Sequence, residues 1–189
     1  MRRLAVYCGS SMGADPLFAE IARDLGVEMA RRGIDLVYGG GHRGLMGVVA
    51  DSVLAGGGKA FGVIPQSLVD LEVAHTGLTE LHTVVTMHER KAKMTELTDG
   101  FIAIPGGIGT LDELFEAWTW NALGYHSKPF CLLNVAGFWD RLIEFLDHVT
   151  QSGFMSPARR SQLLVANEIG EAIEKLDEAE KAAETRMVW

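Results

Sequence analysis

The chain has 189 residues, which is long enough for one well-buried domain and short for two. Hydrophobic residues make up 48% of it and charged residues 22%, an ordinary composition for a globular protein. The net charge of −8 argues against a general binder of nucleic acids or membrane surfaces, although a local pocket can still hold an anion.

Strand and helix patterns alternate along the whole chain. Short apolar runs predict strands at residues 4–8, 35–38, 60–64, 81–85, 101–104, 130–133 and 163–166. Helical spacing predicts helices at residues 16–32, 45–54, 88–97, from 111 onward, 139–149 and 169–184. Residues 65–80 follow neither pattern, and so long a loop in a compact domain is often functional.

Strands that are apolar throughout are typical of a parallel sheet covered by helices on both faces. With right-handed crossovers, this pattern predicts an α/β fold with a doubly wound, Rossmann-like parallel sheet. We predict a single domain over residues 1–189, with a charged C-terminal helix from about residue 169. Ligands of such sheets bind beyond the carboxyl ends of the strands, and the glycine-rich turns of this chain follow predicted strands.

The cysteines and the N-terminus indicate the compartment. Cys8 and Cys131 lie in predicted strands as small buried residues, and two cysteines cannot make a disulfide framework. The chain enters a strand at once without a long apolar signal core, and no apolar run reaches membrane-spanning length. We therefore expect a cytoplasmic protein without membrane partners.

A glycine-rich turn at residues 105–110 separates the predicted strand 101–104 from the next helix. Unpaired N–H groups and the dipole at a helix N-terminus favour an anion, and glycines let the backbone approach a phosphate closely. Thr110 adds a hydroxyl, and Glu113 is expected in the first helical turn. The turn lacks the Lys-Ser/Thr ending of a Walker loop. It predicts chemistry on a phosphorylated sugar or nucleotide, the alternative being a tight connection only.

A second glycine-rich turn, residues 39–44, fits the pattern GxGxxG after a predicted strand. A dinucleotide site needs an acidic residue about 20 positions further on, but the next strand ends at Ile64 and Pro65. A nicotinamide or flavin cofactor is therefore disfavoured. The turn is either a second wall of the nucleotide pocket or a close contact between helix and strand.

Basic and histidine side chains indicate a binding site less clearly than the glycine-rich turns do. Arg90 and Lys91 lie near the start of a predicted helix, where they either bind phosphate or carboxylate or form a solvated basic face. His75, His82 and His88 lack the spacing of metal ligands on one helix face, and no Cys-His cluster accompanies them. The sequence therefore predicts no metal site and no cofactor.

Three motifs occur in a fixed order: YGGG and GLMG within residues 38–47, MHERK at 87–91, and PGGIGTLDE at 105–113. In combination and separation they resemble the LONELY GUY (LOG) family of cytokinin-activating enzymes, phosphoribohydrolases acting on cytokinin riboside 5′-monophosphates. The resemblance extends from the first strand to about residue 166. Similar chains have carried the label lysine decarboxylase, although nothing in this sequence marks a lysine as the Schiff-base partner of pyridoxal phosphate.

The resemblance implies that Arg90 and Glu113 are the catalytic pair. It implies contacts to substrate or phosphate at Glu72, Lys91, Gly106, Gly107, Ile108, Gly109, Thr110 and Thr119. Candidates for the second wall of the pocket are Gly39, Gly40, Gly41 and Met87. Ile108 and Glu89 depart from the Tyr and Gln usual in plant members, which bears on the preferred base.

The reaction implied is hydrolysis of the N-glycosidic bond of cytokinin riboside 5′-monophosphates, of AMP, or of both, releasing the base and ribose 5-phosphate. The resemblance also implies a homodimer with the site near the subunit interface. The alternative is a non-enzymatic carrier of a nucleotide or of the molybdenum cofactor, because such carriers have a similar fold. A carrier would bind its ligand without turnover.

Overall fold

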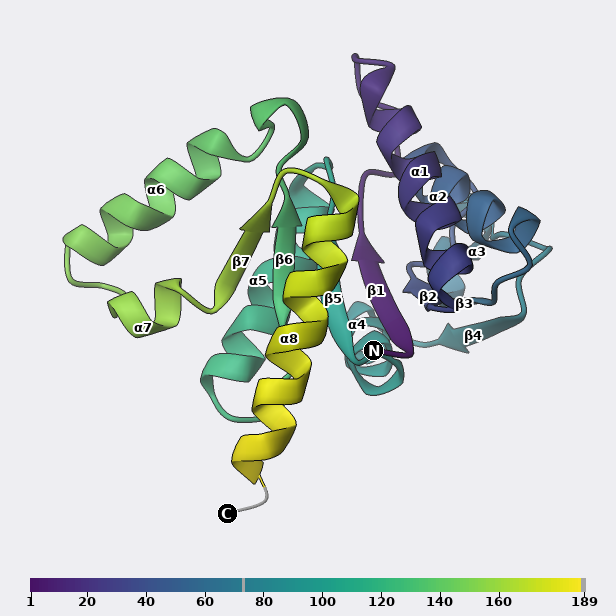
Figure 1. Cartoon of the computed structure of the whole chain (residues 1–189). Helices are drawn as coiled ribbons and strands as arrows, with labels where there is room; N and C mark the ends of the chain where they lie inside the picture. Colours follow the sequence, from purple (N-terminus) through teal and green to yellow (C-terminus); the bar gives the residue numbers. More distant parts are fainter. Residues whose placement is uncertain (73, 188–189) are drawn as a thin grey trace.

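A computed structural model describes residues 1–72 and 74–187, without the side chains of residues 70–72 and 184–187. Over this part the chain forms one sheet of seven strands with helices between them (Figure 1). The strands are β1 (Arg3–Tyr7), β2 (Asp35–Tyr38), β3 (Ala60–Pro65), β4 (Glu80–Val84), β5 (Gly100–Ala103), β6 (Phe130–Leu133) and β7 (Leu163–Ala166). The helices are α1 (Leu17–Arg32), α2 (Gly44–Ala55), α3 (Gln66–Glu72), α4 (Met87–Leu97), α5 (Ile108–Ala122), α6 (Asp140–Gln151), α7 (Pro157–Arg160) and α8 (Ile169–Met187), with a 3-10 turn η1 (Val135–Gly137).

The sheet has the strand order β4-β3-β2-β1-β5-β6-β7, and each described pairing is parallel. The chain builds outward from β1 to β4 and then returns to β5 on the other side of β1. The connections that leave β1 and β5 therefore run in opposite directions, which makes this pair the topological switch point of the sheet. The predicted α/β, doubly wound fold is confirmed.

Two apolar layers hold the helices on the sheet. On one face α1, α2 and α8 contribute buried residues such as Met29, Val49 and Ile173. On the other face α4, α5 and α6 contribute a second layer, which includes Met94 and Trp118. Figure 1 shows α8 in front of the central strands and α4 and α5 behind them. Burial on both faces explains why the strands are apolar throughout instead of alternating.

Both cysteines are buried and free of disulfides. Cys8 directly follows β1, and Cys131 lies within β6. Burial raises the pKa of both thiols, so each stays protonated at neutral pH. Among the described residues, no helix combines the length and the apolar character needed to cross a bilayer.

Two expectations from the sequence were wrong. Residues 65–80 are not irregular throughout, because α3 (Gln66–Glu72) forms there; its seven residues are too few for a helical period to stand out. Helix α5 begins at Ile108 instead of 111, so Glu113 lies in the second turn and not the first. The short elements η1 and α7 were also missed.

Candidate functional site

A cavity of about 270 Å³ lies at the switch point, where β1 and β5 end. The loop after β1, the start of α5 and one residue each of α2 and α4 form its walls. The lining residues are Cys8, Gly9, Ser10, Ser11, Met46, Arg90, Gly107, Ile108, Gly109, Thr110 and Glu113. The sequence predicted Arg90, Glu113 and the α5 residues of this set. It did not single out residues 9–11, although their place after the first strand was the available signal.

The N-terminus of α5 forms one wall of this cavity. Gly107 is its N-cap, and no side chain caps the first turn. Thr110 is only 3% exposed, and its hydroxyl has no hydrogen-bond partner among the described residues. A Cβ on Gly106 would lie 2.1 Å from that hydroxyl and 2.9 Å from the amide nitrogen of Gly9, so the turn requires glycine there. First-turn N–H groups beside an unpartnered buried hydroxyl are donors that can hold an anion.

The loop after β1 is locked against both neighbouring glycine-rich turns. The amide of Gly9 donates to the carbonyl of Pro105 at 3.1 Å, and the amide of Leu45 donates to the carbonyl of Gly9 at 3.0 Å. Gly44 has φ +61°, and a Cβ there would lie 2.3 Å from the carbonyl carbon of Ser10. The start of α2 therefore holds the loop that faces the α5 N-terminus.

Arg90 reaches the cavity from α4 and is only 4% exposed. Its Nε donates to the carbonyl of Val63 at 3.1 Å, and Nη2 donates to the carbonyl of Gly39 at 2.8 Å. These carbonyls lie in β3 and directly after β2, so two strand ends fix the guanidinium plane. A Cβ on Gly39 would lie 2.0 Å from Nη2 and would displace the guanidinium.

The start of α4 explains why Arg90 is so well placed. Thr86 caps the helix by accepting a hydrogen bond from the amide of Glu89 at 3.1 Å. The carboxylate of Glu89 in turn accepts from the amide of Val85, the residue before the cap, at 2.8 Å. In this way the amides of Glu89 and Val85, which would otherwise be unsatisfied, are both paired. Arg90 directly follows Glu89.

Burial and nearby charges shift the pKa values of Tyr7, at the end of β1, and of Cys8, which lines the cavity. Burial raises the pKa of the Tyr7 hydroxyl well above its usual range, and the carboxylates of Glu113 and Glu116 raise it further. Burial and Glu113 also raise the pKa of the Cys8 thiol, against an opposing effect of Arg90. Cys8 therefore lines the cavity as a neutral thiol and not as a nucleophile.

Of the residues implied by the resemblance, Gly106, Lys91 and Thr119 do not line this cavity in the described structure, although Gly106 directly precedes its lining residue Gly107. Lys91 forms an ion pair with Asp112 at 3.0 Å and another with Glu116. Burial alone would lower the pKa of Lys91, but these two carboxylates raise it. Thr119 is exposed further along α5. Glu72 closes α3, and its side chain lies outside the described part of the chain.

The candidates for the second wall divide into two groups. Gly39 and Met87 contact Arg90, the latter through a sulfur that accepts from Nη1 at 3.7 Å. Gly40 and Gly41 instead meet the segment after α3. The carbonyl of Gly40 accepts from the amide of His75 at 3.0 Å, and Gly41 forms a bridge with Ala74.

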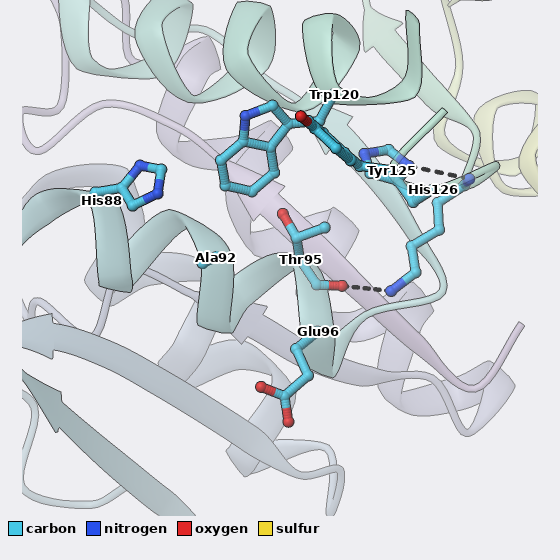
Figure 2. Close-up of a pocket in the computed structure, with 8 residues that line it drawn as sticks. His88, Ala92, Thr95, Glu96, Trp120, Tyr125 and His126 are labelled. Atoms are coloured by element: carbon cyan, nitrogen blue, oxygen red, sulfur yellow. Dashed lines mark hydrogen bonds between the residues drawn. The ribbon is translucent and has the colours of Figure 1, made fainter. Parts of the chain in front are cut away.

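Two further hollows lie near the helices of the site. An apolar one of about 210 Å³ adjoins the cavity and is lined in part by Met12, Phe18 and Phe138. A larger groove of about 680 Å³ lies between α4 and α5 (Figure 2). We call it the α4–α5 groove; its lining residues are His88, Ala92, Thr95, Glu96, Trp120, Tyr125, His126 and Lys128.

The fold and the cavity define an α/β protein with a cavity beside a helix N-terminus at its switch point. A family described as "Possible lysine decarboxylase" matches residues 46–176. The cytokinin riboside 5′-monophosphate phosphoribohydrolase LOG of Oryza sativa subsp. japonica is 46% identical over 188 residues, which cover 100% of this chain and 78% of the rice protein. The chain belongs to the LOG family of phosphoribohydrolases, which are N-glycosidases.

Solved structures support the same fold. The X-ray structure of TM1055 aligns with a TM-score of 0.71 at 25% identity, over 94% of this chain and 99% of that one. A molybdenum cofactor binding protein from Rippkaea orientalis aligns with a TM-score of 0.69 at 21% identity, over 94% and 96% of the two chains. At that identity the second likeness concerns the fold alone.

Proposed function

We propose that this protein hydrolyses the N-glycosidic bond of cytokinin riboside 5′-monophosphates and of AMP, releasing the free base and ribose 5-phosphate. One observation carries the proposal. A single cavity at the switch point is lined by an anion loop with an unpartnered buried hydroxyl, by Arg90 and by Glu113. The relatives of the chain that bear the name phosphoribohydrolase support the same reaction.

The 5′-phosphate binds at the start of α5. Amides of the first turn and the Thr110 hydroxyl donate to its oxygens, and the helix dipole favours its charge. The phosphate is remote from the bond that breaks. Its binding energy nevertheless lowers the barrier, because it fixes the sugar against the reacting groups. Nucleosides without the phosphate are therefore poor substrates.

Glu113 acts at the anomeric carbon. When the bond from C1′ to the base breaks, its electron pair leaves with the base and positive charge develops on the ribose ring. The carboxylate stabilises this charge and accepts a proton from the attacking water, whose oxygen bonds to C1′. The departing base takes up a proton from solvent as it leaves, and Glu113 later returns its proton to solvent.

Arg90 acts beside Glu113 in the same cavity. Its guanidinium is held by two main-chain carbonyls, so its position is set before substrate arrives. It orients the ribose phosphate and favours departure of the base through its fixed positive charge. The contacts implied for Glu72, Lys91 and Thr119 belong to this proposal as further substrate contacts.

We also propose that the protein is a homodimer formed through the α4–α5 groove. Figure 2 shows the Trp120 and Tyr125 side chains along one side of this groove and His88 on the other. Tyr125 is 75% exposed, and Leu123 beside it is also exposed. Apolar surface of this kind is typical of a protein interface. Since Arg90 and Glu113 lie on the two helices that border the groove, the site would be near the interface.

Turnover of two nucleotides tests the proposed reaction. Purified protein is incubated with AMP, with isopentenyladenosine 5′-monophosphate and with adenosine, and the free base is measured by chromatography. We expect base from the phosphorylated substrates only. Glu113→Gln keeps the shape of the side chain but removes the charge, and is expected to lose at least about 100-fold in rate.

Glu144→Gln is the matched control, because this exposed carboxylate on α6 pairs only with Arg141 among the described residues. It should hydrolyse at the wild-type rate. The ratio of the two nucleotide rates distinguishes a cytokinin-activating enzyme from a general AMP nucleosidase. Binding of AMP without release of base would contradict the proposal and favour a carrier.

A further inference from the structure

Three side chains distant in sequence meet beside the turn that holds Arg90. His42 lies in the glycine-rich turn at residues 39–44, Asp51 lies on α2, and His75 follows α3. One ligand atom of each lies within 4.8 Å of those of the other two. We propose that they bind a divalent transition-metal ion, with Zn²⁺ as the probe, and that water completes the coordination. Two imidazoles and one carboxylate suit such an ion.

His75 is the fixed member of this group, only 7% exposed. Its Nε2 lies 2.9 Å from Oδ1 of Asp51, and its Nδ1 accepts from the amide of Gly77 at 3.0 Å. The ring of His42 lies across it, with centroids 4.8 Å apart and planes at 80°. A buried imidazole is therefore already joined to a carboxylate, with a second imidazole alongside.

To coordinate the ion, His42, His75 and the peptide before Gly77 must change position or protonation. Ligand atoms of a tetrahedral Zn²⁺ site are about 3.3 Å apart, so the exposed His42 must move inward by about 1–2 Å. Nε2 of His75 must give up its proton, which transfers through solvent to Nδ1 without change of charge. The hydrogen bond from the amide of Gly77 then breaks, and the peptide between Thr76 and Gly77 must turn so that its carbonyl accepts from Nδ1. Glycine tolerates the backbone angles that such a turn needs.

The position of the site indicates what the metal does. Gly39 accepts from Arg90, and Gly40, the next residue of the same turn, accepts from His75. A bound ion cross-links this turn to α2 and to the segment after α3. The ion therefore stabilises the folded protein around the turn that positions Arg90, and the proposal does not depend on which reaction Arg90 serves.

Equilibrium dialysis of tag-free, chelator-treated protein against micromolar Zn²⁺ tests the site. We expect about one equivalent bound and a rise in Tm of several degrees, because an ion that binds only the folded state stabilises it. His42→Asn and Asp51→Asn should each lose most of this binding. His148→Asn and Asp24→Asn, at exposed positions on α6 and α1, are matched controls that should bind as the wild type does.

Two results would overturn the proposal. One is binding below about 0.2 equivalents by wild-type protein whose circular dichroism shows a folded state. The other is binding that persists in both His42→Asn and Asp51→Asn. Glu113→Gln should bind Zn²⁺ as the wild type does, so a failure of the metal site and a failure of the hydrolysis proposal give different results.

Discussion

Thr110 buries a hydroxyl that has no partner among the described residues, and such a group costs the folded protein stability unless a ligand completes its hydrogen bond. Thr110→Val keeps the shape of the side chain and removes the hydroxyl. We expect KM for AMP to rise about tenfold or more, since a hydrogen bond to a charged group is lost. Tm without ligand should stay equal or rise slightly. A fall in Tm with unchanged KM would instead mean that the hydroxyl is structural.

His126 gives the protein a predictable response to acid. Nδ1 accepts from the amide of Lys128 at 3.2 Å, so Nε2 carries the proton and donates to the carbonyl of Ala117 at 3.0 Å. Burial, with the nearby Lys128 charge, lowers the pKa of His126 from 6.5 to about 4. The unfolded chain therefore takes up a proton below pH 6.5 that the folded chain does not.

The stability associated with His126 is complete above pH 6.5 and declines as the pH falls toward 4. Because the imidazole is partly exposed and solvent screens its charge, the decline is on the order of 2 kcal/mol. His126→Gln removes the titrating group. The fall in Tm between pH 7 and pH 4.5, measured by calorimetry, should be smaller in this variant than in the wild type. His148→Gln, on the exposed face of α6, should leave the wild-type fall unchanged.

At the scale of elements, the start of α4 links helix capping to the position of Arg90. Thr86→Ala removes the N-cap and should lower the free energy of unfolding by about 1 kcal/mol. Glu89→Gln keeps an oxygen that can accept from the amide of Val85, so it should change this free energy by less than about 0.5 kcal/mol. Urea unfolding measures both, and a larger loss in Glu89→Gln than in Thr86→Ala would contradict this account.

The role of Glu89 also bears on the base preference. The departure from the plant Gln at this position suggested an effect on the base, but the Glu89 carboxylate accepts from the amide of Val85, the residue before the N-cap Thr86. We therefore expect Glu89→Gln to leave the ratio of AMP to cytokinin nucleotide turnover unchanged. Ile108, which is exposed at the start of α5 and lines the cavity, is the better candidate for that effect.

The elements themselves were largely readable from the sequence, because buried strands are apolar throughout and long helices repeat their apolar positions. The start of α5 was not. Gly109 has a poor helix propensity, so Ile108 and Gly109 looked like loop, whereas they form the first turn of the helix.

For the whole molecule, the exposed apolar surface of the α4–α5 groove predicts that the protein is a dimer. Wild-type protein should elute as a dimer of the 20.6 kDa chain when its mass is measured by light scattering. Tyr125→Glu places a charge in the α4–α5 groove and should shift the protein toward the monomer. Phe154→Glu changes an even more exposed aromatic residue outside that groove and should stay dimeric. A monomeric wild type would contradict the proposed dimer.

The site was harder to predict than the fold because its parts are brought together by topology. Residues 9–11 and Met46 line the cavity because the strand order brings their segments together. The sequence does not reveal this strand order. The partners of Arg90 are the backbone carbonyls of Val63 and Gly39, and carbonyls carry no residue signal. Spacing along one helix likewise could not bring His42 together with Asp51 and His75, since they belong to three segments.

The rates at which the two buried thiols are labelled report on opening of the structure. Cys8 lines the cavity and is 7% exposed, whereas Cys131 in β6 is fully buried and reacts with an alkylating reagent only when the sheet around it opens. The rate at which Cys131 is labelled under native conditions therefore measures how often the sheet opens, and the rate for Cys8 measures access to the cavity. Faster labelling of Cys8 than of Cys131 would mean that the cavity admits the reagent without unfolding of the sheet. Substrate that binds in the cavity should slow the labelling of Cys8 selectively.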